Sequence, residues 1–244
     1  MSITEIQAWL DSPQGRYVVD WEQTRLDQVV ADIFGFNAVQ VGFPYVDFLR
    51  CNRMPFRLRC SVEPCEGVGV RASPWELPFD SGSIDLVVLP HVLEFSTQPH
   101  QVLREVERIL VPEGRVVVTG FNPHSLWGVR RRLSRRQGAF PWRGQYLSVP
   151  RLKDWMTLLG MESQVSAFGC YGPATCDPRW IERWSFMDRL GERRWRFGGG
   201  VYLVQAIKRV RGMRLITPNW RESRAAAKRL SPAVQKQQKE AWKQ

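Results

Sequence analysis

Three histidines are the first side chains to consider, because imidazole can act as a general base or bind a metal. His91, His100 and His124 are not accompanied by a cluster of acidic residues or cysteines, so the sequence predicts no metal site. His91 comes directly after a continuous apolar run that ends at Pro90. With an ordinary pKa of about 6.5, His91 is the best candidate for a catalytic base. The alternative is a pocket-wall residue whose hydrogen bonds are satisfied.

A second chemical feature is the arginine-rich segment 127–143, which lies in a region without acidic residues between Glu113 and Asp154. Guanidinium groups next to aromatic rings can bind the phosphates of a nucleic acid or an anionic lipid surface. The alternative is a solvated basic face of a helix. The residues concerned are Arg130, Arg131, Arg132, Arg135 and Arg136, with Trp127, Phe140 and Trp142 as aromatic neighbours.

Composition limits the class of protein that carries these residues. The chain has 244 residues, and its 43% hydrophobic and 11% aromatic content excludes a chain that is disordered throughout. No apolar run has the roughly 18 residues that a membrane span needs. Five cysteines without a CxxC pair, and a start that does not resemble a secretory signal, predict a cytoplasmic protein.

The net charge of +11 is concentrated near the end of the sequence. Residues 205–244 contain 11 Lys or Arg against 2 Asp or Glu, whereas residues 1–204 contain 24 against 22. This division predicts a domain over residues 1–209, opened by helices within residues 1–35. Residues 210–244 are expected to form a basic, flexible tail that can associate weakly with a nucleic acid or an anionic surface.

Hydrophobic spacing predicts an α/β fold. Helices are expected at 3–10, at 21–34, in a short piece near 45–51, at 98–110 and at 150–159, and Gln14-Gly15 should separate the first two. Seven strands are expected at 38–42, 57–62, 68–72, 84–89, 115–119, 162–168 and 201–207. Because strands alternate with helices, we expect a three-layer sandwich with a mainly parallel seven-stranded sheet.

Residues 68–124 contain four motifs in succession, LPFDSGSIDLVV, HVLEF, LREVERILVPEG and RVVVTGFNP. Their order and spacing resemble the second half of a class I, Rossmann-like S-adenosylmethionine-dependent methyltransferase. The match is to the broad type 11 group, which includes quinone C-methyltransferases. The resemblance implies S-adenosylmethionine as the cofactor, bound across the carboxyl ends of the first four strands.

The resemblance also implies positions for several side chains around that cofactor. Ala72, Ser73 and Trp75 follow the third strand and should lie by the adenine, with Ser73 where the family usually has Asp. Trp75 is expected either to stack on the purine or only to cover the helix layer. Pro90 and His91 follow the fourth strand, where the methyl donor and the acceptor should meet.

The glycine signature after the first strand departs from the family pattern. The family has an acidic residue and then three alternating glycines, which let the backbone approach the cofactor. This chain has Gln40 in place of the acid, and only Gly42 of the three glycines, followed by Phe43-Pro44-Tyr45. Proline has no N–H group to donate, and the two aromatic residues add bulk.

Other candidate contacts come from the ends of the second and fifth strands. Glu63 is the candidate to hold the ribose hydroxyls, with Glu66 as its competitor and a surface carboxylate as the third reading. Asn122 and His124 are expected to line the acceptor pocket, or else to belong to a turn in which Pro123 stops the strand.

These observations predict a methyltransferase that uses S-adenosylmethionine and transfers a methyl group to an unidentified acceptor, a small molecule in preference to a macromolecule. The alternative is a catalytically inactive methyltransferase-like binding module. Such a module would associate with RNA or an anionic surface through its basic segments.

Overall fold

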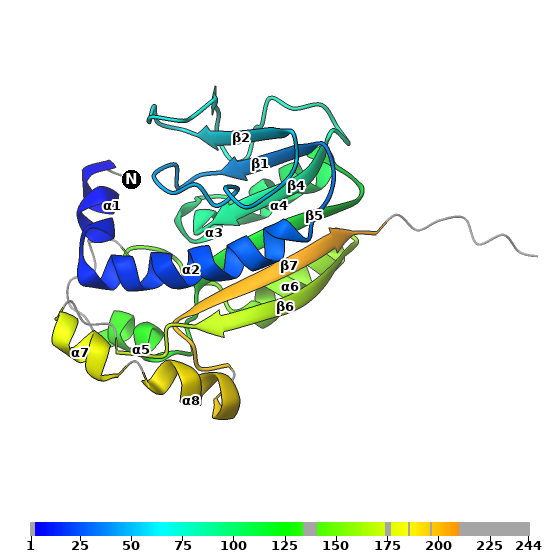
Figure 1. Ribbon diagram of the computed structural model, residues 1–244. Coiled ribbons are helices and arrows are strands. Elements are labelled where there is room, and N and C mark those ends of the chain that lie inside the picture. The colour runs from blue at the N-terminus through cyan, green and yellow to red at the C-terminus, as the bar shows by residue number, and fades with distance from the viewer. Residues whose placement is uncertain (1–2, 134–140, 174–176, 185, 196, 210–244) are drawn as a thin grey trace, which may run out of the picture. The chain divides into compact units, whose positions relative to one another are not determined.

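The computed structural model describes residues 3–133, 141–173, 177–184, 186–195 and 197–209 (Figure 1). The strands of its sheet are β1 (Asn37–Val41), β2 (Phe56–Ser61), β3 (Val70–Arg71), β4 (Ile84–Pro90), β5 (Leu110–Phe121), β6 (Met161–Gly169) and β7 (Val201–Lys208). The helices are α1 (Ile3–Leu10), α2 (Pro13–Ala31), α3 (Val92–Phe95), α4 (Pro99–Ile109), α5 (Leu126–Leu133), α6 (Val149–Leu158), α7 (Pro178–Arg183) and α8 (Phe186–Arg194).

The strands form one sheet in the order β3-β2-β1-β4-β5-β7-β6. The first five strands of this order pair in parallel, and β7 runs antiparallel to both β5 and β6. The predicted α/β fold with a mainly parallel seven-stranded sheet is therefore confirmed. The parallel strands all end at one edge of the sheet, which is the edge where a ligand crevice forms in such folds.

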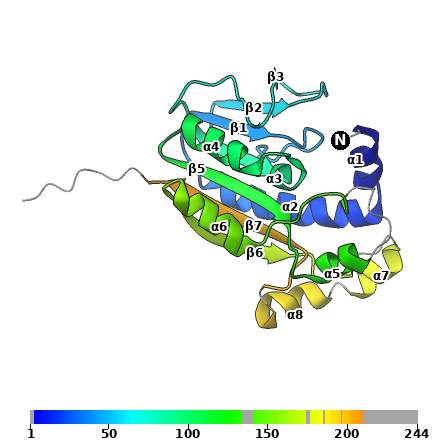
Figure 2. The same cartoon turned by 180° about the vertical axis from the view of Figure 1, so that it is seen from behind.

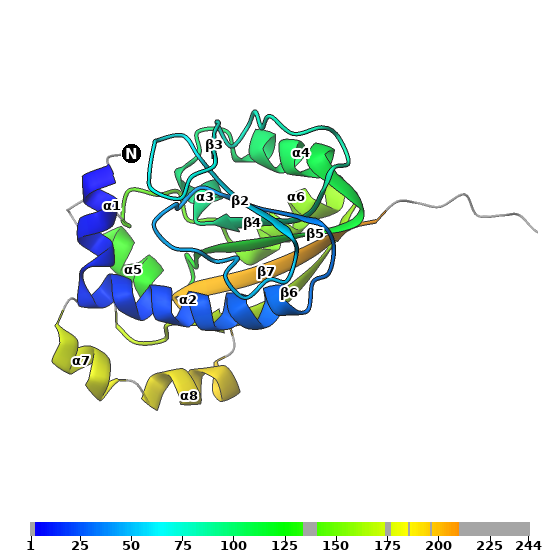
Figure 3. The ribbon, with the colours of Figure 1, turned by 45° about the horizontal axis from the view of Figure 1, so that its top comes forward.

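Two hydrophobic cores, one on each face of the sheet, explain why the central strands are mostly apolar. On β4, Val87 and Leu89 join the core under α3, α4 and α6, whereas Leu86 and Val88 join the core under α1 and α2. Figures 2 and 3 show α2 on one face of the sheet and α4 and α6 on the other. A strand covered on both faces cannot alternate between apolar and polar residues.

The expected break between the first two helices is wrong in its position. The chain turns at Ser12, whose Oγ accepts a hydrogen bond from the Gly15 backbone N–H at 3.1 Å and so caps α2. Gly15 lies in the first turn of α2, where a Cβ atom would come within 2.0 Å of the Trp9 carbonyl oxygen. This glycine permits the close packing of the two helices and does not end either of them.

Other departures from the expected elements are local. Residues 45–51 form turns in place of the expected short helix, and β3 is confined to two residues. Residues 111–114, which lie between the expected helix at 98–110 and the expected strand at 115–119, belong to β5 and form an irregularity in its pairing with β4. The predicted tail, residues 210–244, lies outside the described residues, so the domain boundary at 209 stays a prediction.

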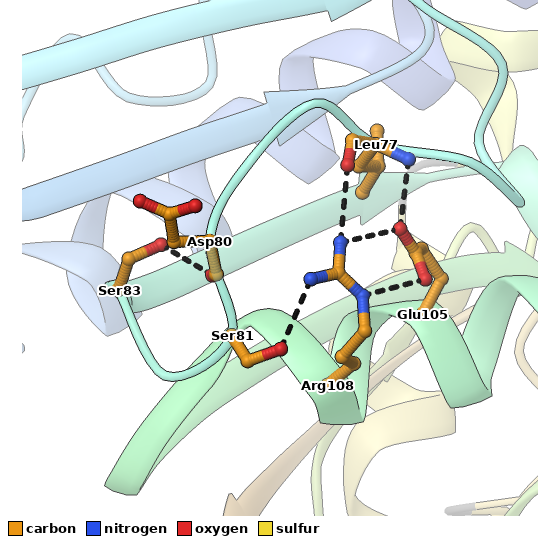
Figure 4. Close-up of polar contacts among 6 residues, drawn as sticks. All are labelled: Leu77, Asp80, Ser81, Ser83, Glu105 and Arg108. Carbon is orange, nitrogen blue, oxygen red and sulfur yellow. Dashed lines mark hydrogen bonds and ion pairs between the residues drawn. The ribbon is translucent and has the colours of Figure 1, made fainter.

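Arg108 on α4 fastens the loop that precedes β4, and Figure 4 shows its contacts. Its Nη2 donates to the Leu77 carbonyl oxygen at 3.1 Å, and its Nη1 donates to Ser81 Oγ at 3.1 Å. Glu105 pairs with the same guanidinium at 2.7 Å and accepts the Leu77 backbone N–H at 2.8 Å. Glu105 and Arg108 of LREVER thus hold the loop LPFDSGS, so direct contacts join these two motifs.

We expect Arg108→Ala to lower the free energy of unfolding by about 1 kcal/mol, because half-exposed charged hydrogen bonds contribute on that scale. Urea unfolding would measure the change. Arg104→Ala is the matched control, since Arg104 is exposed on the same helix. Equal losses for the two variants would contradict a fastening role for Arg108.

The same pair predicts an acid sensitivity. The hydrogen bond from Arg108 lowers the pKa of Glu105 below its ordinary value of 4.5. A lowered carboxyl pKa stabilises the fold above the ordinary pKa, and that contribution disappears as the pH falls through the lowered value. Glu105→Gln should therefore flatten the loss of stability below about pH 4.5, as measured by urea unfolding across that range.

Candidate active site

A pocket of about 290 Å³ opens at the edge of the sheet where the parallel strands end. Its wall includes residues that follow β1, β2, β3 and β4, which the strand order brings together. Five of the predicted cofactor residues line it, namely Gly42, Glu63, Trp75, Pro90 and His91. The rest of the wall is mostly apolar, and it includes Ile6 from α1 and Phe95 from α3.

The other three predicted cofactor residues do not line this pocket. The Ala72 backbone N–H donates to the Ser61 carbonyl oxygen at 3.1 Å, which extends the pairing of β3 with β2. Ser73 forms a tight turn in which its carbonyl oxygen accepts the Glu76 N–H at 3.0 Å. This turn presents Trp75 at the pocket, with 36% of its surface exposed.

Gln40, the third of these residues, lies fully buried beneath the loop that follows β1. Its Nε2 donates to the carbonyl oxygens of Phe43 at 3.0 Å and Val46 at 2.9 Å, with a longer contact of 3.4 Å to that of Gly42. Its Oε1 accepts the Phe48 backbone N–H at 3.0 Å. A carboxylate at this position could not donate to inward-facing carbonyl groups, so the amide suits this loop.

The loop held by Gln40 leaves the pocket open despite its two aromatic residues. Gly42 has φ +77°, and a Cβ atom there would lie 2.6 Å from Val92 Cγ2. Phe43 is buried and stacks on Phe48 with ring centroids 6.1 Å apart. A side chain at position 42 would therefore clash with Val92 of α3, which explains why Gly42 is retained. The ring of Phe43 packs in the core.

Glu63 is the better placed of the two carboxylates that follow β2. It lies two residues beyond Ser61, is half-buried and lines the pocket. Glu66 is exposed and is not part of the pocket wall. The structure therefore favours Glu63 over its competitor, and its contact with a ribose stays a prediction.

His91 lies between two buried carboxylates at the floor of the pocket. Its Nδ1 is 2.8 Å from Glu94 Oε2, and its Nε2 is 2.9 Å from Glu22 Oε1. The side chains of all three residues are at most 1% exposed. Glu94 also accepts the Phe121 backbone N–H through Oε1, and His91 adopts the left-handed backbone region with φ +52°.

The two carboxylates determine the protonation of His91. Burial disfavours the charged imidazolium, but Glu22 and Glu94 outweigh it and raise the pKa of His91 to about 10. Burial raises the pKa of Glu94, although the contact with His91 opposes that change. An imidazole that already carries its proton at neutral pH cannot take another, so this geometry disfavours the predicted role of His91 as a base.

Glu22 and Glu94 were not predicted as site residues, although each has a signal in the sequence. Glu22 occupies a core-facing position of α2, four residues after Val18 and four before Leu26, both of which are fully buried. A charged residue at the centre of an apolar helix stripe requires a buried partner. Glu94 follows His91 by three residues at the start of α3, so a contact between them could have been predicted.

The residues predicted to form an acceptor pocket or a polyanion contact are dispersed. Asn122 Nδ2 donates to the carbonyl oxygens of Phe197 at 2.8 Å and Gly199 at 3.0 Å, so it joins the end of β5 to the chain before β7. His124 is exposed, and neither residue lines the pocket. Arg130 and Arg132 are exposed on α5, and Arg131 is half-buried. Arg135 and Arg136 lie outside the described residues.

A column of aromatic rings runs from the pocket to α5. The centroids of Phe43 and His91 are 6.0 Å apart, and those of His91 and Phe121 are 4.3 Å apart. Phe121 stacks on Trp127 at 5.8 Å, and Trp127 lies 6.2 Å from Trp142. The pocket floor and the base of α5 are therefore parts of one packed unit.

Comparisons with known proteins agree with this geometry. Residues 57–118 match a family model described as a methyltransferase domain. A curated relative, described as the uncharacterized protein YafS of Escherichia coli strain K12, is 30% identical over 156 residues. The match covers 63% of this chain and 64% of the relative, so the chain spans about two thirds of the length of that relative.

Two solved structures have the same arrangement of strands and helices. One, from Archaeoglobus fulgidus, has a TM-score of 0.57 and 16% identity over 78% of this chain and 94% of its own. The other, from Mesorhizobium loti, has a TM-score of 0.54 and 17% identity over 75% and 96% of the two chains. Both are described as S-adenosylmethionine-dependent methyltransferases. The chain has the class I methyltransferase fold.

Within this methyltransferase fold, the described residues contain no group of three or more His, Cys, Asp or Glu side chains arranged as metal ligands. No helix in the described part of the chain combines the length and the apolar content needed to cross a membrane.

The hydrogen bonds of Gln40 predict a large effect from an isosteric change. In Gln40→Glu, a buried carboxylate would face the carbonyl oxygens of Phe43 and Val46 without a donor between them. We expect a loss of about 3 kcal/mol in the free energy of unfolding at neutral pH, measured by urea denaturation. Gln101→Glu, an exposed change of the same type on α4, is the control.

The loss in Gln40→Glu should diminish in acid. Burial raises a carboxyl pKa, so the variant should recover stability relative to wild type as the pH falls and the new side chain gains a proton. A deficit that is the same at pH 7 and pH 5 would contradict the proposed cause.

The paired carboxylates of His91 predict an alkaline decline in stability. The pKa of His91 rises from 6.5 to about 10 on folding. The contribution of His91 to the free energy of unfolding is therefore complete below pH 6.5 and is lost as the pH approaches 10. Removing one carboxylate in Glu22→Gln should lower the pKa of His91 and move this decline to lower pH. Unfolding by urea at a series of pH values would measure the shift, with Asp20→Asn, an exposed change on the same helix, as the control.

Proposed function

We propose that this protein is a methyltransferase that binds S-adenosylmethionine in the pocket at the ends of β1, β2, β3 and β4. The observation that carries the proposal is the open pocket beside Gly42, which exists although two of the three usual glycines are absent. The family match over residues 57–118 and the shared fold support it.

The residues around the pocket suit the parts of this cofactor. Glu63 offers a carboxylate that can accept hydrogen bonds from two neighbouring hydroxyl groups. Trp75 offers an indole face of the size of a purine. Gly42 leaves its backbone free of a side chain at the pocket wall. Because Glu22 and Glu94 both contact His91, a cationic sulfonium would not meet an unpaired positive charge at the pocket floor.

When bound, the cofactor supplies an electrophilic methyl group on a sulfonium centre. The protein's own part is to position the reacting groups and to exclude water, and positioning can supply much of the acceleration for such a displacement. Pro90, Val92 and Phe95 give the pocket an apolar wall, and Ile6 of α1 closes one side. His91, held on both ring nitrogens, orients the floor of the pocket and keeps its proton.

The acceptor is a small molecule in our proposal, because the wall that it would meet beside the cofactor is mostly apolar. The acceptor must bring an atom that is nucleophilic without deprotonation by His91. A thiolate, an amine or an activated carbon meets this requirement.

Isothermal titration calorimetry with S-adenosylmethionine and S-adenosylhomocysteine tests the proposal. Both ligands should bind wild type, and Glu63→Gln should weaken binding about tenfold or more, because hydrogen bonds to a charged group are worth about 1.5–3 kcal/mol. Glu66→Gln is the matched control and should bind like wild type.

Two results would count against this function. Absence of both heat and thermal stabilisation with either ligand would exclude the cofactor. Binding of both ligands without methyl transfer to any fraction of a small-molecule extract would instead favour an inactive binding module.

A further inference from the structure

Helix α5 exposes an apolar stripe that no described residue covers. Leu126, Val129 and Leu133 are spaced by three and four residues, so they lie on one face of the helix. They are 41%, 49% and 78% exposed. A surface helix ordinarily turns such a stripe toward the core, as α4 does with its four buried residues.

The same helix carries a concentrated positive charge. It contains Arg130, Arg131 and Arg132 and no acidic residue. Two of these arginines are positioned by aromatic rings, since Arg130 lies 5.5 Å from the Trp142 ring centroid and Arg131 lies 4.8 Å from that of Tyr146. In the described part of the chain, neither Arg130 nor Arg132 has an acidic partner. Within the described residues, these two charges are therefore not neutralised.

A second group of exposed apolar side chains lies on α7 and α8. Trp180, Phe186 and Leu190 are 48%, 50% and 46% exposed. The ring of Trp184 stacks between those of Trp180 and Phe186, at 6.5 Å and 6.0 Å. Exposed Arg179 and Arg183 accompany these rings on α7. Figures 1 and 2 show α5, α7 and α8 at the same end of the domain, and Trp127 of α5 donates to the Gly172 carbonyl oxygen at 3.0 Å.

The chemistry of these side chains selects among partners. A nucleic acid offers phosphates to arginine and bases to aromatic rings, but it gives no favourable contact to a stripe of Leu and Val. An acidic protein would satisfy the arginines and would still need a matching apolar groove. An anionic bilayer satisfies both, since its headgroups attract arginine and its acyl chains receive Leu, Phe and Trp.

We propose that α5, with the exposed rings of α7 and α8, is a docking surface for an anionic lipid bilayer. The apolar stripe enters the boundary between headgroups and acyl chains, and Arg130 and Arg132 contact the lipid phosphates. This surface depends on the described residues and not on the activity proposed above, so each can fail without the other.

The docking surface is joined to the pocket through the segment that follows α5. Tyr146 stacks on Phe121 at 5.2 Å, and the Gln145 backbone N–H donates to the Glu94 carbonyl oxygen at 2.7 Å. The adjoining Phe95 lines the pocket.

Sedimentation of the full-length protein with vesicles tests the proposal. The vesicles contain either phosphatidylcholine alone or equal amounts of phosphatidylcholine and phosphatidylglycerol. Wild type should bind the anionic vesicles and bind the neutral ones much more weakly. Val129→Glu/Leu133→Glu should lose at least tenfold in affinity for the anionic vesicles. Phe34→Glu/Leu158→Glu, which adds the same charge at other exposed apolar positions, should bind like wild type.

A second variant separates a loss of docking from a loss of folding. Arg130→Gln/Arg132→Gln leaves the apolar stripe intact and should weaken binding to anionic vesicles about tenfold or more, because each arginine near such a surface contributes about 1 kcal/mol. Thermal unfolding of each variant confirms that the domain is folded.

Several outcomes would overturn this docking surface. Equal binding by wild type and both docking variants would assign the interaction to another part of the chain. Absence of vesicle binding, equal binding to neutral and anionic vesicles, or binding to an RNA probe alone would exclude an anionic bilayer as the partner.

Discussion

The pocket depends on one buried amide. Loops after the first strand of this fold usually approach a ligand by means of several glycines, which allow unusual backbone angles. In this chain the side chain of Gln40 fixes the backbone of the loop instead, because it hydrogen-bonds three carbonyl groups and one N–H group of the loop from below. Arg59 adds a contact of 3.0 Å to the Pro44 carbonyl oxygen. A loop fixed from beneath tolerates a proline and two aromatic residues on its upper side.

The cluster of polar side chains beneath the pocket is held by ion pairs, whereas the loop above it is held by amide hydrogen bonds. Glu22, His91 and Glu94 come from two helices and the turn after β4, and they meet where no water shields them. Removing His91 would leave two buried carboxylates without the cation that both of them contact, which is costly. The cluster therefore links α2 to α3 and fixes the direction of the imidazole. Its role in our proposal is to position the pocket floor, while the chemistry takes place above it.

Much of the fold could be predicted from the sequence, because its signals are local. The continuous apolar run of β4 and the periodic apolar stripe of α4 each specify an element without knowledge of the rest. Gly160 follows the expected helix at 150–159 and has φ +74°, which is typical of a glycine that ends a helix. The error at Gly15 arose because a glycine that permits close packing has the same sequence signature as one that ends a helix.

The site was harder to predict, because its interactions join distant residues. The resemblance predicts that Gln40 contacts the cofactor, because the family has an acid there. Only the loop's inward carbonyl groups reveal the structural role of Gln40. Glu22 is 69 residues away from His91 in the sequence, so their contact could not be inferred from spacing. Pro90, Glu63 and Trp75 were easier to place, because each follows a strand whose end faces the same edge.

The aromatic column between Phe43 and Trp142 has a mechanical consequence. Stacked rings in a packed interior compress very little. The separation between the pocket and α5 is therefore fixed when the domain folds, and it acts as a spacer of constant length. Any molecule that contacts both the pocket and α5 therefore has to span this fixed distance.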